Sequence, residues 1–464
     1  MNWRHLISNQ KNPLIFAPIP GLIRKIAVPV AVGSFFNTMF NVVDTFYGGL
    51  ISSQALAALS LSFPIYFIII AVGFGVGQGT TALIGNALGR GDQEEAQRHA
   101  AQGLWYGVLV SIVLTVGVIA AAPAIVESMG ATDPEYKQMT LDYIVPLFYG
   151  TIFFITRFMA NAILNAVGNT IPGRNAMIAG FFLNILLDPW FIYGGFGLPA
   201  MGIRGIAYAT VLVQFLSAVY TFYEAFKTDL LSWESLRANL LPNLGAFGRI
   251  SEQGFPNMLD MMGVSLGFFV LNFYAGRFGQ NAVAALGAAS RIEQIFLLPL
   301  LGFNVATLTL VASNNGARNY ARVQDTFQQA IKYSSLVMLV TMIIGILFAR
   351  PLMRVFTADP EIIEYGVSYV WYRCLALIPN AVFFMSSSAL RGLKKPIWPL
   401  VWNLIRFAGL PWLLIYIFVE RLGGGVSTIW SMSSASFFIT AVIIWLIARQ
   451  MLPKVEPKLA GENA

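Results

Sequence analysis

The sequence predicts an all-α membrane protein with twelve transmembrane helices arranged in two six-helix lobes. Three observations predict this fold: an apolar composition, a series of runs long enough to cross a bilayer, and an internal repeat. Hydrophobic residues make up 57% of the 464 positions and charged residues only 11%, whereas about a quarter of the residues in a soluble domain are charged. The net charge of +7 comes from basic residues in the predicted loops, so membrane topology explains it and no nucleic-acid partner is expected.

Twelve apolar runs reach the length of about 20 residues that a helix needs to cross the hydrocarbon core. The second and eighth runs are longer, and we expect them to tilt or to project beyond the bilayer. Residues 1–20 lack the apolar segment and cleavage site of a signal peptide, so we expect none to be removed. The runs are 23–49, 55–88, 99–121, 140–162, 171–194, 203–226, 251–276, 282–315, 327–349, 366–390, 396–419 and 427–448.

Basic residues are concentrated in the connections on one side of these runs, for example Arg90, Arg98, Lys394 and Lys395. Connections that are rich in Lys and Arg usually stay in the cytoplasm. We therefore expect both termini to be cytoplasmic, in agreement with an even number of spans, and we expect a location in the cytoplasmic (inner) membrane.

The chain repeats itself with an offset of 227 residues, because residues 46–92 align without a gap with residues 273–319 and 273 − 46 = 227. In this alignment FYGGLISSQALAAL lies over FYAGRFGQNAVAAL. Six spans followed by six similar spans that enter from the same side form parallel repeats, related by an axis along the membrane normal. We predict an N-lobe at 1–238, which includes a cytoplasmic linker, and a C-lobe at 239–464, with rocking of the lobes around a central cavity.

The first span carries polar side chains that are costly in hydrocarbon. Asn37, Asn41 and Asp44 are spaced i, i+4 and i+7, so they share one face of a helix. A carboxylate in the bilayer core costs about 2.5–3.5 kcal/mol on insertion scales, and such residues usually mark an ion or proton path. Pro29 lacks an N–H group and is expected to kink the span, as a hinge. The two amides are candidate substrate or cavity contacts.

The fifth span contains a second acid, and Asn184 and Asp188 are again spaced i, i+4. Asn161 in the fourth span and Thr210 in the sixth add an amide and a hydroxyl group. If these spans bundle with the first, two carboxyl groups and several neutral oxygens converge, which serves a proton or a hard monovalent cation such as Na⁺. The alternative is that these groups only join helices by hydrogen bonds, as is common in membranes.

The repeat places the coupling chemistry in the N-lobe. Asp44 aligns with Leu271, and Asp188 aligns with Leu410 when the two Pro-Trp pairs are superposed. The first repeat thus keeps both acids where the second has leucine. We therefore predict that Asp44 and Asp188 act as the coupling pair.

Other candidates line the predicted cavity less directly. Glu293 fits two roles, contact with a cationic substrate or an ion pair with Arg373. Tyr208 precedes Thr210 in the sixth span and is a candidate contact. Met258 and Met261 have flexible thioethers that suit a promiscuous apolar wall, although lipid-facing packing explains them as well.

Several classes of enzyme are excluded by missing motifs. One cysteine and two histidines leave no disulfide framework, no Cys/His metal cage and no nucleophile–histidine set. The segment GVGQGT at 75–80 lacks the lysine of a phosphate-binding loop and lies inside a predicted span. We therefore expect no enzymatic activity and no cofactor apart from a coupling ion.

These features together resemble the MATE (multidrug and toxic compound extrusion) antiporters, most closely the DinF-like branch. The similar segments are Pro29 with VDTFYGG in the first span, NAILNAVGNTIPG, NILLDPWFIYG, and RIEQIFLLPLLGF with NNGAR. The resemblance implies export of amphipathic, often cationic, drugs by alternating access, driven by H⁺ or Na⁺. It also implies that Asp44, Asn184 and Asp188 bind the coupling ion, with Asn161 and Thr210 as further members.

The chain departs from NorM-like members of that family, which carry acids in the seventh and tenth spans. Here Ser265 stands in the seventh span, and Tyr372, Arg373 and Asn380 stand in the tenth. This difference favours coupling in the N-lobe alone.

A lipid or lipid-linked oligosaccharide flippase of related architecture is the alternative function. It needs a basic cavity for a pyrophosphate, whereas intramembrane arginines are few; Arg157 and Arg406 also fit as interface anchors that snorkel to the headgroups. A channel is disfavoured because duplicated half-sites suggest alternation. The expected partners are amphipathic small molecules and membrane lipids, and a monomer is expected.

Overall fold

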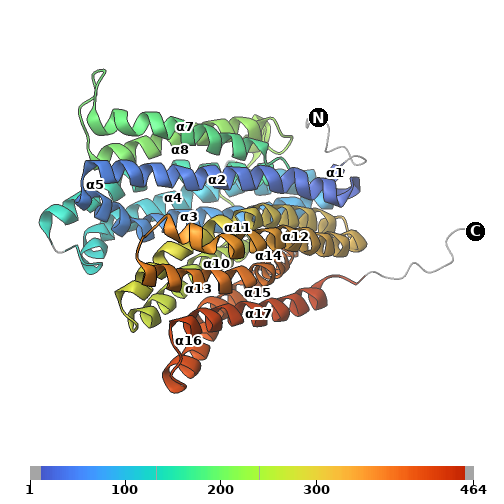
Figure 1. The fold of residues 1–464 in the computed structure, drawn as a ribbon. Helices are drawn as coiled ribbons and strands as arrows, with labels where there is room; N and C mark the ends of the chain where they lie inside the picture. The colour runs from blue at the N-terminus through green and yellow to red at the C-terminus, as the bar shows by residue number, and fades with distance from the viewer. Residues whose placement is uncertain (1–11, 132, 240, 455–464) are drawn as a thin grey trace, which may run out of the picture. The chain divides into compact units, whose positions relative to one another are not determined.

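The computed structural model describes residues 12–131, 133–239 and 241–454, and these residues are almost entirely helical (Figure 1). The predictions for the two termini therefore lie outside the described residues. The helices are α1 (Pro13–Phe16), α2 (Ile19–Ile51), α3 (Ser53–Gly89), α4 (Gln93–Ser128), α5 (Pro134–Tyr149), α6 (Thr151–Ala166), α7 (Ile171–Tyr193), α8 (Ile203–Phe226), α9 (Trp233–Ala238), α10 (Leu244–Gly276), α11 (Gln280–Gly316), α12 (Tyr320–Arg354), α13 (Pro360–Leu375), α14 (Leu377–Gly392), α15 (Ile397–Leu404), α16 (Leu410–Ile415) and α17 (Val426–Met451), with the π-helical segments η2 (Ile405–Gly409) and η3 (Tyr416–Arg421).

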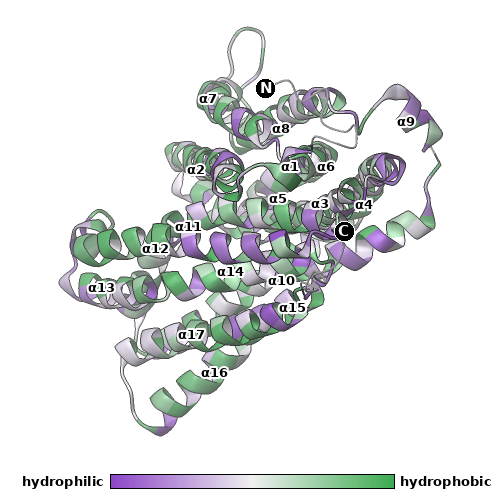
Figure 2. Ribbon diagram, turned by 90° about the vertical axis from the view of Figure 1, so that its right-hand side faces the viewer, coloured by the Kyte–Doolittle hydropathy of each residue, from purple (hydrophilic) through white to green (hydrophobic). Residues whose placement is uncertain are grey.

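Among the described residues, ten helical segments are long and apolar enough to cross a membrane, and two bent pairs bring the total to twelve. Large apolar side chains are exposed along them, including Val116, Leu186, Phe269 and Leu347, and Figure 2 shows hydrophobic residues along most of the helices. Exposed apolar surface of this extent indicates contact with lipid. The prediction of an all-α membrane protein is confirmed.

Two of the predicted spans are bent pairs of helices, a feature that the sequence did not predict. The fourth span is α5 and α6 with an angle of 46° at Gly150, and the tenth is α13 and α14 with an angle of 48° at Ala376. A Cβ atom on Gly150 would lie 2.6 Å from the side chain of Val211, so glycine allows α8 to approach the bend. In the tenth span, Pro379 lies just after the bend and removes a backbone N–H group from the first turn of α14.

The helices repeat in the same order and at nearly the same length. α2 and α10 each have 33 residues, α3 and α11 each have 37, and α4 and α12 have 36 and 35. The bent pairs follow at the same place in each half. The correspondence fails at the fifth span of each half. In the first half this span is the continuous helix α7, and in the second it consists of α15, η2, α16 and η3, with two π-helical segments. The predicted internal repeat is confirmed.

Contacts divide the chain into two compact units. The first contains Ile26–Ile84 and Gln93–Val264; the second contains the segment that ends at Lys25, Gly85–Asp92 and the chain from Ser265 onward. The division at Val264 lies inside α10, whereas the lobe boundary at 238/239 stays a prediction. In the first unit α8 packs against α5, α6 and α7, and in the second α11 packs against α12, α13 and α14.

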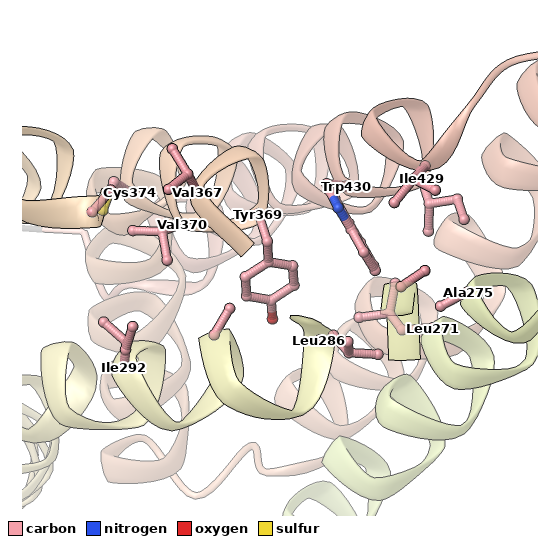
Figure 3. Packing of buried hydrophobic residues seen from close by; sticks show 14 of the residues in the cluster. Leu271, Ala275, Leu286, Ile292, Val367, Tyr369, Val370, Cys374, Ile429 and Trp430 are labelled. Atoms are coloured by element: carbon pink, nitrogen blue, oxygen red, sulfur yellow. The ribbon is translucent and has the colours of Figure 1, made fainter. Parts of the chain in front are cut away.

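Each unit has its own apolar core. The core of the first unit includes Ile69, Leu147, Phe148 and Phe154. The core of the second unit joins α10, α11, α13 and α17, and Figure 3 shows Tyr369 and Trp430 at its centre. Their rings meet edge to face, with centroids 5.2 Å apart.

Close helix packing in the first unit depends on Gly205, near the start of α8. A Cβ atom at this position would lie 2.6 Å from the carbonyl carbon of Phe191 in α7, and backbone atoms do not move as easily as a side-chain end. We predict that Gly205→Ala lowers the free energy of unfolding by about 1–3 kcal/mol, as overpacking usually does, seen as a lower midpoint in thermal unfolding of the detergent-solubilised protein.

The matched control is Gly117→Ala in α4, where no atom lies within 4 Å of the added Cβ. Its midpoint should stay equal or rise, because alanine is favoured over glycine in helix interiors by roughly 0.5–1 kcal/mol. Equal midpoints for Gly205→Ala and the unmodified protein would contradict the close approach of α7 and α8.

Candidate functional site

Two acids from different helices meet inside the first unit. Asp44 comes from α2 and Asp188 from α7, and their side chains are 6% and 0% exposed. One amide nitrogen, that of Asn184, lies within 3.0 Å of a carboxyl oxygen of each acid, so the two carboxyl groups are close neighbours. Two carboxyl groups in one buried site disfavour double ionisation. The pair is therefore suited to hold one proton.

Asn184 joins the two acids. Its Nδ2 donates to Asp44 Oδ1 at 3.0 Å and to Asp188 Oδ1 at 2.9 Å. The i, i+4 spacing of Asn184 and Asp188 in α7 places the amide over the second acid, as the sequence predicted. Thr210 of α8 completes the set, since its Oγ1 donates to Asp44 Oδ2 at 3.3 Å. Three helices thus supply four buried polar side chains to one place.

Two oxygens of this cluster keep an unused capacity to accept. Asp188 Oδ2 and Asn184 Oδ1 are buried and have no hydrogen-bond partner. A buried acceptor without a partner is costly, so sites that retain one usually have a function. Carboxyl, amide and hydroxyl oxygens are also the ligands that a hard monovalent cation prefers. The cluster is therefore suited to take up a proton or a sodium ion.

Pro189 explains how α7 is attached to α2 beside the cluster. Proline has no N–H group, so the carbonyl of Ile185, four residues earlier, loses its donor within the helix. The hydroxyl of Tyr47 donates to this carbonyl at 3.2 Å. Tyr47 lies three residues after Asp44, on the same face of α2. Tyr47 was not among the residues predicted from the sequence, although Pro189 signals a carbonyl that needs an outside donor.

The contact between α2 and α7 continues toward the start of both helices. A Cβ atom on Gly33 would lie 3.2 Å from the Cα atom of Arg174, and the rings of Phe36 and Phe181 are 5.5 Å apart between centroids. Thr170, which precedes α7, donates to the carbonyl of Ile26 at 3.0 Å. This last contact lies less than one turn before Pro29. The proline is therefore held within a stretch of α2 that is fixed to α7 on both sides.

Several predicted residues do not join the cluster. Asn37 is exposed, and Asn41 donates to the carbonyl of Asn37 at 2.8 Å. The amide of Asn41 is thus satisfied within its own helix, which is a common outcome for asparagine. Of the three polar residues predicted to share one face of α2, only Asp44 therefore bonds to α7. Tyr208 is 44% exposed, unlike the buried members of the cluster.

Asn161 lies at a different level of the first unit. A Cβ atom on Gly173 would lie 2.7 Å from its Oδ1 atom. Gly173 and Asn184 are both in α7, and at 1.5 Å per residue their separation along the helix is roughly 16 Å. Met258 and Met261 are half-buried in α10, where the backbone of Met258 passes Gly75 of α3. The contacts among the described residues do not connect Asn161 or these methionines to the acids.

In the second unit, Glu293 forms an ion pair with Arg373, one of its two expected roles, with 3.4 Å between Oε2 and Nε. Arg406 does not snorkel to an interface, which is a correction: it is 1% exposed, and its Cζ atom lies 4.2 Å from the ring centroid of Phe383 and 4.0 Å from that of Phe437. Aromatic rings attract a guanidinium group and replace water around it.

A family model for MatE matches the chain twice, over residues 29–190 and 256–417. The two matches are offset by 256 − 29 = 227 residues, the offset of the internal repeat, and together they cover more than half of the chain. The chain belongs to the MatE family. It is thus a multi-pass membrane transporter and not an enzyme, and the MatE match includes Asp44, Asn184 and Asp188.

Similar proteins agree with membership of the MatE family. The "Probable multidrug resistance protein NorM" of Thermotoga maritima is 28% identical over 86% of this chain and 86% of its own length. The "Multidrug export protein MepA" of Staphylococcus aureus is 24% identical over 94% of this chain and 95% of its own length. A solved structure described as the "Outward-facing conformation of a multidrug resistance MATE family transporter of the MOP superfamily" has a TM-score of 0.88 and 26% identity, covering 97% of this chain and 100% of that chain.

The hydroxyl of Tyr47 is the only described donor to the carbonyl that Pro189 leaves open. We predict that Tyr47→Phe destabilises this MatE protein by about 1–3 kcal/mol, because a buried acceptor is left without a partner. Thermal unfolding in detergent measures the change. The control is Tyr193→Phe, which removes a hydroxyl from a residue that is 58% exposed at the end of α7. Similar midpoints for both variants would show that Tyr47 does not hold α7.

Proposed function

We propose that this protein is a secondary antiporter that exports amphipathic, often cationic, organic compounds in exchange for H⁺ or Na⁺ by alternating access. The observation that carries the proposal is the pair of buried acids, Asp44 and Asp188, bridged by the amide of Asn184 inside the first unit. Two carboxyl groups so close in a water-poor environment disfavour double ionisation. Uptake or release of one positive charge at this pair would therefore change the hydrogen bonds between α2 and α7.

The bond pattern suggests how the coupling ion acts on α2. Asp44 is the part of α2 that the cluster holds, through bonds from α7 and α8. When the shared proton leaves, or a sodium ion replaces it, the two carboxylates repel or turn toward the metal. In either case the bonds between α2 and α7 are rearranged. We propose that Pro29 is the point at which α2 bends in response.

The proposed substrates follow from the relatives, which are described as multidrug resistance and multidrug export proteins. Asn37, Asn41, Tyr208, Met258, Met261 and Glu293 stay candidate contacts for such compounds. The finer assignment to the DinF-like branch rests on the similar segments. The seventh span, with Ser265, and the tenth, with Tyr372, Arg373 and Asn380, lack the acids of NorM-like members and so favour coupling in the N-lobe. The inner membrane, cytoplasmic termini and a monomeric state complete the proposal.

A flippase for lipids or lipid-linked oligosaccharides is the second candidate, because Arg373 and Arg406 supply buried positive charge in the second unit. The carboxyl pair favours the antiporter over this candidate. A flippase has no evident use for two acids that share a proton, whereas an ion-coupled antiporter requires such a group.

We predict that Asp44→Asn and Asp188→Asn each reduce exchange of drug for cation to the background rate. Asparagine keeps the size of the side chain but removes the proton that the pair exchanges. Efflux of a fluorescent cationic dye from proteoliposomes measures the rate, with thermal unfolding as a check on folding. Glu364→Gln is the control, because Glu364 is 59% exposed and pairs with Arg350 in the second unit. Normal exchange by Asp44→Asn would refute the assignment.

The coupling ion is identified by imposing the pH gradient and the sodium gradient separately on the same proteoliposomes. We expect one of the two gradients to drive accumulation of the dye and the other to have no effect. A proton-coupled protein should also release protons when dye binds in weakly buffered detergent solution. Failure of both gradients would remove the antiporter proposal, and movement of a labelled lipid in the same vesicles would then favour the flippase.

A further inference from the structure

The start of α2 belongs to the second unit, although the rest of the helix belongs to the first. The division between the units falls between Lys25 and Ile26. The short helix α1, which precedes α2, packs against α11 of the second unit, and its residue Leu14 is 2% exposed. One helix thus connects the two units whose relative movement the proposed transport cycle requires.

A proline explains why the end of α1 needs hydrogen-bond donors from elsewhere. Pro18 has no N–H group, so the carbonyl of Leu14, four residues earlier, cannot find a helical donor in its own segment. Ala17, the residue before this proline, is extended with a ψ of 155°, as residues before proline usually are. The chain therefore breaks between α1 and α2 and leaves carbonyl groups open at the end of α1.

Asn314 of α11 and Arg322 of α12 supply the missing donors. Asn314 Nδ2 donates to the Leu14 carbonyl at 3.1 Å, and Arg322 Nε donates to the same oxygen at 3.4 Å. Arg322 Nη2 donates to the carbonyl of Ala17. Asn314 is fully buried, and a buried polar group that loses its partner is costly. Two side chains of the second unit thus hold the end of α1.

The next anchor along the chain lies in the first unit. Thr170 donates to the carbonyl of Ile26 at 3.0 Å, and both residues belong to that unit. The start of α2 is therefore fastened to the second unit before this point and to the first unit from this point onward. A change in the relative position of the two units must bend the stretch between the anchors or open the bonds at the end of α1.

Opening those bonds is less costly than bending the stretch. Residues 19–25 are part of the continuous helix α2, and bending would disturb its backbone hydrogen bonds. Ile19, Leu22 and Ile23 are also buried there. Arg322, in contrast, is only partly buried, so water can replace the bonds that its guanidinium group loses.

We propose that Arg322 and Asn314 are positioning residues, which fasten the end of α1 to the second unit and release it once in each transport cycle. We call these bonds the latch, and it is closed in this structure. The inference rests on the proposed function, because alternating access requires the two units to move relative to each other. It adds to the proposed bend at Pro29, which lies beyond Ile26 and therefore within the first unit.

Labelling of a single cysteine measures how often the latch opens. Leu14→Cys is combined with Cys374→Ala, which removes the only native cysteine, and the detergent-solubilised full-length protein reacts with a maleimide. The thiol reacts only when residue 14 leaves its buried position, so the rate reports the open fraction. Arg322→Gln should raise this rate by about tenfold or more, as loss of bonds from a charged donor does. Arg322→Lys keeps the charge but not the planar fork, so its rate should be intermediate.

Two controls separate opening of the latch from general loosening. Lys332→Gln removes an exposed charge from the same helix, α12, and should leave the rate unchanged. Phe16→Cys replaces Leu14→Cys at a position of α1 that is 67% exposed, and this thiol should react quickly in every variant. The midpoint of thermal unfolding checks that each variant is folded.

The response to dye distinguishes a latch from a static anchor. A fluorescent cationic dye, with its binding checked by fluorescence polarisation, should change the labelling rate of Leu14→Cys several-fold. Asp44→Asn should also change the rate, because it fixes the neutral form of the acid through which α2 is held in the first unit. A static anchor would be loosened by Arg322→Gln in the same way, but it would respond neither to dye nor to Asp44→Asn.

Equal labelling rates with bound dye, without dye and in Asp44→Asn would overturn the proposal. A rate in Arg322→Gln that equals the rate with the native arginine would overturn it as well. Failure of the proposed function appears differently, as absent exchange of dye in proteoliposomes. If the dye does not bind, the proposed substrates fail, and the rate in Asp44→Asn still decides whether the latch moves.

Discussion

The amide of Asn184 is the contact on which the first unit depends. It donates one hydrogen bond to an acid of its own helix and another to an acid of α2. Without these donors, two carboxyl groups would face one another in a water-poor interior with nothing but a proton between them. The amide allows the acids to stay together in more than one protonation state. It also converts a change at either acid into a change in the contact between α2 and α7.

The two halves of the chain have kept their architecture and separated their chemistry. Helix lengths match from α2 through α6 and from α10 through α14. Yet the first unit buries acids, and the second buries Arg373 and Arg406 among aromatic rings. Leu271, the counterpart of Asp44, is simply part of the apolar core. The two halves thus share one architecture but bury different charged groups: the first unit buries Asp44, Asp188 and Arg157, and the second buries Arg373 and Arg406.

Much of the fold and the centre of the site could be predicted from the sequence, because both depend on strong local signals. Apolar runs define the spans. The free-energy cost of placing Asp44 and Asp188 in hydrocarbon already implied that both lie in one polar site inside the protein. The bends at Gly150 and Ala376 were missed because an apolar run looks the same whether its helix is straight or bent. Asn161 was predicted to join the acids because spacing shows which face a residue occupies but not which partner it finds. The aromatic rings around Arg406 come from α14, η2 and α17, so no local sequence pattern predicts them.

The bond from Tyr47 to Ile185 has a consequence for hydration. Because Pro189 removes the donor that α7 itself would provide, this carbonyl depends on α2 for its only described bond. Any separation of the two helices exposes it, and hydrocarbon offers no replacement. The helices therefore part at low cost only when water molecules enter between them. In the proposed antiport cycle, entry of water between α2 and α7 would therefore accompany separation of the two acids, and this water would be the path for the coupling ion.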